Sequence, residues 1–335
     1  MDVLLDFATT FASQLQKPAL AFLLAGMALA ALGSKLVIPD AIYRFIVFML
    51  LMRIGLGAGM EIRDANLGEV LLPALAAAVV GCVIVVLGRY ALGALPGVRM
   101  EDAIATGGLF GAVSASSLAA AMVVLQEEGV VFEAWVAALY PFMDIPALIL
   151  AIVMAGLYRA KQGGTEGRPV RAGSIVVQSL RSAAVSALLL GLALGLVSRP
   201  EGVFEEFYDP LFRGLLSILM LVLGIEAWSR LSELREVAHW FVAYALVAPL
   251  VHGLLAFGLG YLVHLATGFS PGGVILLAVI AASSSDISGP PTLRAAIPSA
   301  NPSSYIGSST AIGTPIAIAV GIPLYLTLGR IVFGV

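Results

Sequence analysis

Long hydrophobic runs separated by short polar stretches dominate this chain of 335 residues. Most runs match the roughly 20 apolar residues that a helix needs to cross a bilayer. The pattern therefore predicts ten membrane-spanning helices. Their expected ranges are 18–34, 40–60, 70–95, 103–126, 132–158, 175–198, 209–229, 237–266, 272–296 and 304–332.

Two of these runs are interrupted where a membrane helix would lie at mid-depth. The first reads GGLFGAVSASSLAAA from Gly107 to Ala121, and the second reads AVIAASSSDISGPPTL from Ala278 to Leu293. A break inside lipid leaves backbone N–H and C=O groups unpaired, so it is tolerated only where protein, water or substrate satisfies them. Paired breaks in corresponding halves of a chain indicate the substrate site of a transporter.

The widest polar gap, from Arg159 to Gly173, divides the expected spans into two sets of five. A duplicated unit with an odd number of spans inserts in opposite orientations, so the halves are predicted to form an inverted repeat. We expect an all-α membrane protein with a first repeat at 1–158, a linker at 159–174 and a second repeat at 175–335. The alternative is that Gly and Ser recur only because membrane helices use small residues for packing.

Composition agrees with a membrane protein. Hydrophobic residues make up 60% of the chain and charged residues 12%, whereas soluble domains carry about 25% charged residues. The single cysteine, Cys82, excludes internal disulfides and cysteine-based metal sites. A net charge of −3 gives no sign of nucleic-acid binding.

Basic residues in the loops predict the orientation. If the linker is cytoplasmic, the loops on its side hold Lys35, Arg99, Arg159, Lys161, Arg168, Arg171, Arg230, Arg235 and Arg294. The opposite loops and ends then hold only Lys17, Arg63, Arg199 and Arg330. Because basic residues favour the cytoplasmic side, we expect a cytoplasmic linker and both termini outside.

The breaks could bind an anion without a basic side chain. A half-helix that begins at mid-membrane directs free N–H groups and a partial positive charge at whatever lies before it. Ser114 and Ser116 add hydroxyls in the first break. Pro290 suits the first turn of a half-helix after the second break, since no N–H is needed there. The alternative is a pair of kinked packing helices whose hydroxyls bond back to the preceding turn.

Two acids, Asp144 and Asp286, lie in otherwise apolar spans. A carboxylate at membrane depth is costly and marks an ion pathway by default. Asp286 lies within the second break, where hydroxyl and carbonyl oxygens complete the hard-oxygen set that cations such as sodium prefer. The neighbouring hydroxyls belong to Ser284, Ser285 and Ser288. Asp144 is either a ligand or a structural cap, and long charged side chains near span ends, Glu226 among them, are interpreted as structural.

Long stretches of the sequence resemble the sodium-dependent bicarbonate transporters of cyanobacteria. They are ALGSKLVIPDAI, ATGGLFGAVSASS, ALYPFMDIPAL, FYDPLFRGLLSILM and AVIAASSSDISGPPTLRAAIPSANPSSYIGSSTAIGTPIAI. The resemblance covers nearly the whole chain. It implies a high-affinity symporter, not an enzyme, that imports HCO3⁻ across the inner membrane for inorganic carbon accumulation. Sodium is then the coupling ion, and no other cofactor is implied.

The resemblance also implies an architecture and a site. A core domain from spans 3–5 and 8–10 would move, elevator-like, against a gate domain from spans 1–2 and 6–7, within a homotrimer. The anion would be held at Ala112, Val113, Ser114, Gly289 and Pro290, with the Ser116 hydroxyl beside them. Sodium would be held by Asp286, Ser284, Ser285 and Ser288, with Asp144 close by.

A soluble PII-like regulator that responds to adenine nucleotides is a further implied partner, on the cytoplasmic face. Many family members have a much longer segment between the fifth and sixth spans, whereas this chain has only RAKQGGTEGRPVRAG. Any regulation that needs the insertion is therefore in doubt.

Two other functions stay open from the residues alone. The first is a sodium-coupled symporter for another small monocarboxylate. The second is an intramembrane aspartyl protease, which has a Pro-Ala-Leu motif apart from both of its acids. In this chain Pro146 to Leu148 follows Asp144 almost directly, and the serine-rich breaks would have no role.

Overall fold

A computed structural model describes residues 18–64, 67–162, 177, 181, 183–231, 239–286 and 289–335. These residues form helices and connecting loops, with no strand among them. The first half contains α2 (Pro18–Ala31), α3 (Asp40–Asp64), α4 (Leu67–Gly93), α5 (Met100–Gly111), α6 (Ala115–Glu127), η1 (Ala134–Ala138) and α7 (Leu139–Lys161). The second half contains α9 (Ala183–Val197), α10 (Glu201–Val203), η2 (Phe204–Tyr208), α11 (Asp209–Leu231), α12 (His239–Thr267), α13 (Pro271–Ala282), α14 (Gly289–Ala296), η4 (Ser303–Gly307), η5 (Ser309–Gly313), α15 (Thr314–Ile316), η6 (Ala317–Gly321) and α16 (Ile322–Phe333).

Among the described residues, seven helical stretches are long and apolar enough to cross a bilayer. They are Ala41–Arg63, Gly68–Gly93, Met100–Glu127, Ala134–Lys161, Glu201–Glu226, His239–Thr267 and Ser303–Phe333. Three shorter apolar helices, Ala21–Ala31, Ser186–Val197 and Pro271–Ala282, occupy the places of the first, sixth and ninth expected spans. The chain is therefore a multi-pass membrane protein, while ten crossings stay a prediction. Most of the predicted linker lies outside the described residues.

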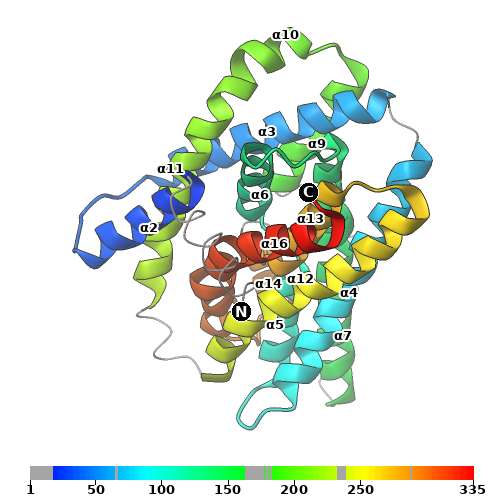
Figure 1. The fold of residues 1–335 in the computed structure, drawn as a ribbon. Helices are drawn as coiled ribbons and strands as arrows, with labels where there is room; N and C mark the ends of the chain where they lie inside the picture. Colours follow the sequence, from blue (N-terminus) through cyan, green and yellow to red (C-terminus); the bar gives the residue numbers. More distant parts are fainter. Residues whose placement is uncertain are drawn as a thin grey trace.

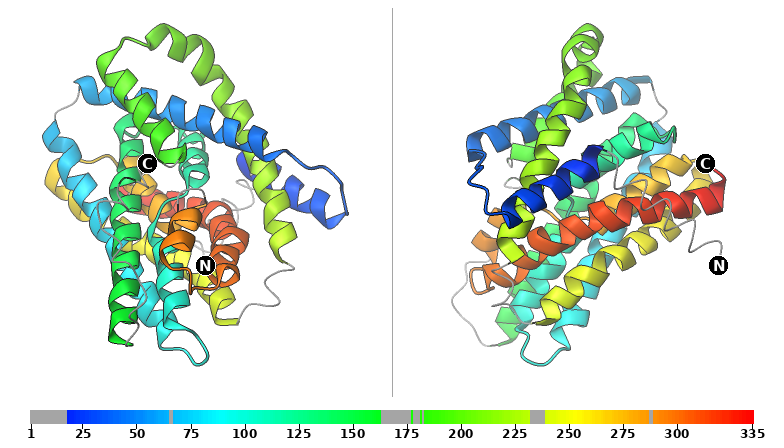
Figure 2. Two further views of the ribbon diagram at one scale, coloured as in Figure 1. Left: turned by 180° about the vertical axis from the view of Figure 1, so that it is seen from behind. Right: turned by 60° about the vertical axis from the view of Figure 1, so that its left-hand side comes forward.

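The helices pack in two groups (Figure 1). In the glycine-paired group, which we define as α2, α3, α9 and α11, α2 packs on α11 and α3 packs on α9. In the broken-helix group, α4 to α7 and α12 to α16, α4 packs with α5, α7 and α12, and α12 packs with α13. Two further views show α2, α3 and α11 on one side of the broken-helix group (Figure 2).

Glycines bring the helices of the first group into backbone contact. A Cβ on Gly26 of α2 would lie 2.1 Å from a carbonyl oxygen of α11, and one on Gly224 of α11 would lie 2.0 Å from a carbonyl oxygen of α2. The pair α3–α9 repeats this arrangement, since the corresponding distances for Gly55 and Gly191 are 2.3 Å and 2.7 Å. The first predicted span thus pairs with the seventh, and the second with the sixth. If the first half of the chain is exchanged for the second, each of these two pairs becomes the other.

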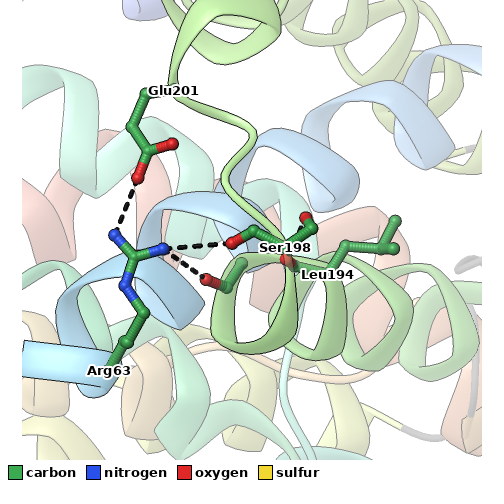
Figure 3. A network of polar contacts seen from close by, with 5 residues as sticks. Arg63, Leu194, Ser198 and Glu201 are labelled. Carbon is green, nitrogen blue, oxygen red and sulfur yellow. Dashed lines mark hydrogen bonds and ion pairs between the residues drawn. The ribbon is translucent and has the colours of Figure 1, made fainter.

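Charged side chains tie the ends of the same group. Arg63, at the end of α3, donates to the Ser198 carbonyl oxygen at 3.0 Å and to Glu201 Oε1 at 2.7 Å (Figure 3). Arg53 forms an ion pair with Asp209 at the start of α11. These contacts agree with the structural role expected for charges near span ends.

Matching polar contacts also join the two halves of the broken-helix group. Glu133 Oε1 accepts the backbone N–H of Ser270, the residue before α13, at 2.9 Å. Asp102 Oδ1, in the first turn of α5, accepts the backbone N–H of Asn301 at 2.6 Å. Glu133 precedes the last span of the first half and contacts the start of α13. Asn301 precedes the last span of the second half and contacts the start of α5, so the two contacts are equivalent in the two halves.

Candidate functional site

The first predicted break is confirmed. Helix α5 ends at Gly111, and α6 begins at Ala115 after a Ser114 with extended backbone (φ −92°, ψ 121°). Ser114 Oγ accepts the N–H of Ser117 at 3.2 Å, which is the hydrogen bond of an N-cap serine. The local sequence therefore both ends one half-helix and starts the next.

The second predicted break is confirmed as well. Helix α13 ends at Ala282, Ser283 is extended (φ −77°, ψ 177°), and α14 begins at Gly289 with Pro290 in its first turn. A proline there forfeits no helical hydrogen bond. Ser288, a predicted sodium ligand, lies outside the described residues.

The two breaks lie against each other. The N–H of Ser114 donates to Ser283 Oγ at 3.0 Å, although 169 residues separate them in the sequence. In the other direction, the N–H of Ser285 donates to the carbonyl oxygen of Leu109 at 2.9 Å. Backbone groups left over by one break are thus satisfied by the other, as a break at membrane depth requires.

Asp286 lies at this junction and contacts the opposite break. Its Oδ2 accepts hydrogen bonds from Ser114 Oγ at 3.1 Å and from Ser116 Oγ at 3.0 Å. Its Oδ1 is buried and has no hydrogen-bond partner among the described residues, and the same holds for Ser117 Oγ. One carboxylate oxygen therefore accepts hydrogen bonds from the first break, and the other is available to a cation.

Asp144 reaches the first break from α7. The side chain is fully buried, and its Oδ1 accepts the N–H of Val113 at 3.1 Å. This contact favours the cap interpretation of Asp144. In the second break, Ser284 Oγ lies 3.3 Å from Thr314 Oγ1 in the last span. Thr314 was missed from the sequence because a lone threonine among many hydroxyl residues carries no signal.

The amides expected to bind the anion are already paired. The N–H of Ala112 donates to a carbonyl oxygen of α5 at 3.1 Å, that of Val113 to Asp144, and that of Ser114 to Ser283. Within the described part of the chain, the N–H groups of Ala115 and Ser116 have no hydrogen-bond acceptor, as the geometry of a helix start dictates. The free donors therefore lie in the first turn of α6.

Gly289 is a glycine for a reason that the sequence did not indicate. Its N–H donates to Ser285 Oγ at 2.8 Å, and a Cβ at this position would lie 2.5 Å from Leu109 Cδ2. The resemblance implied that Gly289 helps to hold the anion. The observed packing requires glycine whether or not an anion is present.

A family model described as the Na⁺-dependent bicarbonate transporter superfamily matches residues 18–330, nearly the whole chain. The chain belongs to this superfamily. Comparison with curated proteins finds no match. Membership in the superfamily identifies a transporter rather than a protease, with sodium and bicarbonate as the ions that its members carry.

The junction suits the sodium dependence of the superfamily. Within the described residues, no group of three or more His, Cys, Asp or Glu side chains could hold a metal ion. A cation at the junction would instead be held by the Asp286 carboxylate together with hydroxyl and carbonyl oxygens. Hard oxygen ligands of this kind bind hard cations.

Glu226 adds a second acid from the glycine-paired group. Helix α11 packs against α6 and η5, and the Glu226 carboxylate interacts electrostatically with that of Asp286. From the sequence we expected Glu226 to be a structural charge near a span end. Its position after the apolar run LMLVLGI was the signal that could have identified it.

Proposed function

We propose that this protein is a sodium-dependent bicarbonate symporter. It imports HCO3⁻ across the inner membrane, driven by the sodium gradient, for inorganic carbon accumulation. The observation that carries the proposal is the Asp286 carboxylate at the junction of the two breaks, hydrogen-bonded to the serines that open α6. A negative side chain is thereby held at a helix N-terminus, where a transported anion would also bind.

This arrangement explains how sodium and bicarbonate would be coupled. Without a cation, the Asp286 carboxylate repels an anion that approaches the start of α6. Sodium bound at Asp286 Oδ1 offsets this charge, so bicarbonate binds more tightly when sodium is present. Because coupling between two ligands is reciprocal, bicarbonate tightens sodium binding by the same factor.

The roles of the individual residues follow from this scheme. Sodium binds Asp286 with help from hydroxyls of the second break, and Asp144 holds the first break in place by accepting the Val113 N–H. The proposed sodium-side hydroxyls are Ser284, Ser285 and Ser288. The proposed anion-side residues are Ala112, Val113, Ser114, Ser116, Gly289 and Pro290. Because the amides of Ala112, Val113 and Ser114 are paired within the protein, the N–H groups at the start of α6 would be the ones that bind the anion.

The glycine-paired group is proposed as the gate and the broken-helix group as the core of an elevator-like transporter. The helix pairs α2–α11 and α3–α9, and the two matching polar contacts of the core, support an inverted repeat. The pairing of substrate sites with broken helices in inverted repeats is general among secondary transporters.

Orientation, assembly and regulation complete the proposal. The loop charges support a cytoplasmic linker and extracytoplasmic termini. A cysteine at Gly164, in a protein without Cys82, should resist impermeant maleimide in intact cells, and labelling from outside would reverse the orientation. A homotrimer and a PII-like partner rest on the resemblance alone. Co-purification with that partner, with and without adenine nucleotides, tests whether the short linker still permits binding.

The central test is uptake by the purified protein in proteoliposomes. Labelled bicarbonate should accumulate with an inward sodium gradient and should not accumulate when potassium replaces sodium. Unlabelled acetate and formate serve as competitors. Uptake without sodium would refute the coupling, and stronger inhibition by acetate than by bicarbonate would assign the site to another monocarboxylate.

A further inference from the structure

The last turn of α5 presents two consecutive side chains to two glycines, one at the start of α14 and one in η5 of the last span. Leu109 and Phe110 are both fully buried. A Cβ on Gly289 would lie 2.5 Å from Leu109 Cδ2, and a Cβ on Gly313 would lie 2.8 Å from Phe110 Cε1 and Cζ. Real Cβ atoms do not occur at such distances, so each side chain rests where only a glycine leaves room.

Hydrogen bonds tie these contacts to the second break. The carbonyl oxygen of Leu109 accepts the N–H of Ser285 at 2.9 Å. Gly313 directly precedes Thr314, whose Oγ1 lies 3.3 Å from Ser284 Oγ. A displacement of Gly313 would therefore be passed to Ser284, two residues before Asp286.

Phe110 also packs against aromatic side chains of α12. Its ring packs edge-on against Tyr244 of α12 with a centroid separation of 5.2 Å, and His252 of the same helix lies 6.2 Å away. Close-packed interiors transmit strain rather than absorb it. A larger residue at Gly313 would therefore press on the Phe110 ring and would also place its Cβ 3.3 Å from Ser284 Oγ.

We propose that Leu109 and Phe110 are positioning residues that set the spacing between the two breaks. The spacing determines whether Asp286 lies within hydrogen-bond distance of Ser114 and Ser116, and hence the geometry of the sodium site. This role rests on the proposed sodium-coupled function. It assigns the two side chains to coupling, although neither has a polar group that could touch an ion.

A size exchange, in which Gly313 is replaced by a larger residue and Phe110 by a smaller one, tests the inference. Overpacking of this kind is destabilising, so Gly313→Ala should raise the half-saturating sodium concentration for uptake about tenfold. Adding Phe110→Leu makes room for the new methyl group and should bring that concentration back to within about threefold of the wild type. Gly258→Ala is the control, because no atom lies within 4 Å of its added Cβ.

The sodium-induced rise in melting temperature of the purified proteins provides a second readout that does not need transport. Gly313→Ala should reduce this rise, and the double variant should recover it. General misfolding would instead lower the melting temperature with and without sodium, and Phe110→Leu would not repair it.

The outcomes separate this inference from the proposed function. If the wild type shows no sodium-dependent bicarbonate uptake but the sodium-induced thermal shift follows the size exchange, the function is wrong and the positioning role stands. If the wild type transports and Gly313→Ala keeps the wild-type sodium dependence in both assays, the positioning role is wrong. A defect in Gly313→Ala that Phe110→Leu fails to relieve in either assay also overturns it.

Discussion

The two helix breaks share a geometry but differ in charge. Each begins with an extended residue and is anchored by a side chain from the span that follows its half-helices. In the first break, Asp144 accepts the Val113 N–H. In the second, Thr314 lies in hydrogen-bond distance of Ser284. The first break thus receives a charged anchor and has no acid of its own, whereas the second has a neutral anchor and contains Asp286.

This difference supports the proposal that the two breaks bind different ions. In the first, an Asp144 oxygen accepts a backbone N–H, and among the described residues the N–H groups of Ala115 and Ser116 have no acceptor. Free N–H groups at the start of a helix favour an anion. In the second, Asp286 offers a carboxylate oxygen without a partner among the described residues. Two helix breaks of the same geometry could thereby bind two ions of opposite sign next to each other.

Removing the charge of Asp286 should have the largest effect. Asp286→Asn keeps the shape but leaves no negative oxygen for sodium or for the Ser114 and Ser116 hydroxyls. Hydrogen bonds to charged groups contribute about 1.5–3 kcal/mol each, so half-saturating sodium should rise about 100-fold or uptake should be lost. Uptake against sodium concentration is the measurement, with Glu205→Gln on an exposed acid as control. An unchanged sodium curve would remove Asp286 from the site.

Two substitutions of Asp144 distinguish an anchor from a ligand. Asp144→Asn retains an oxygen that can accept the Val113 N–H, so uptake should fall only about threefold. Asp144→Leu leaves that N–H unpaired in the interior, at a cost of about 1–3 kcal/mol, so uptake should fall about 30-fold. Equal losses in both variants, with a raised sodium requirement, would show that Asp144 binds sodium directly and would make the two breaks alike.

Thr314→Val tests the neutral anchor of the second break. The substitution keeps the β-branched shape and removes the hydroxyl near Ser284. Because a neutral hydrogen bond contributes about 1 kcal/mol, the half-saturating sodium concentration should rise about fivefold. Thr327→Val, which removes a hydroxyl that donates to the Pro323 carbonyl oxygen of its own helix, should leave the sodium curve unchanged. A larger effect at Thr327 than at Thr314 would contradict the anchoring role.

Glu226→Gln should have the smallest effect of the series. Glu226 adds negative potential near Asp286 from α11. Removing one charge at this range should weaken sodium binding about threefold at low ionic strength and less at high salt. Sodium curves measured at two concentrations of choline chloride test this. A tighter sodium site in the variant would show that Glu226 opposes sodium binding instead.

Much of this organisation follows from the sequence. The breaks at Ala112–Ser114 and after Ala282 can be predicted because Ser, Gly and Pro interrupt long apolar runs. Asp286 is readable because an acid at membrane depth requires a function. Both signals are local. The breaks lie where they were predicted, and the ion-binding role of Asp286 stays a prediction.

The remaining features depend on contacts between distant segments. The Asp144–Val113 bond, the approach of Glu226 from α11 and the packing of Leu109 against Gly289 join residues whose spacing in the sequence shows no pattern. The pairing of the first-break amides was also not predictable. A break in the helix indicates that N–H groups are released, but the tertiary structure decides which of them find acceptors.

The backbone contacts at Gly26, Gly224, Gly55 and Gly191 have a mechanical consequence. A shift of either helix pair by one residue would bring a side chain against a carbonyl oxygen that now faces a glycine. The helices of each pair therefore cannot slide along each other by one residue without a steric clash. Spin labels on α2 and α11 should keep a constant separation throughout a transport cycle, and this fixed pair provides a reference against which any displacement of the ion-carrying helices can be measured.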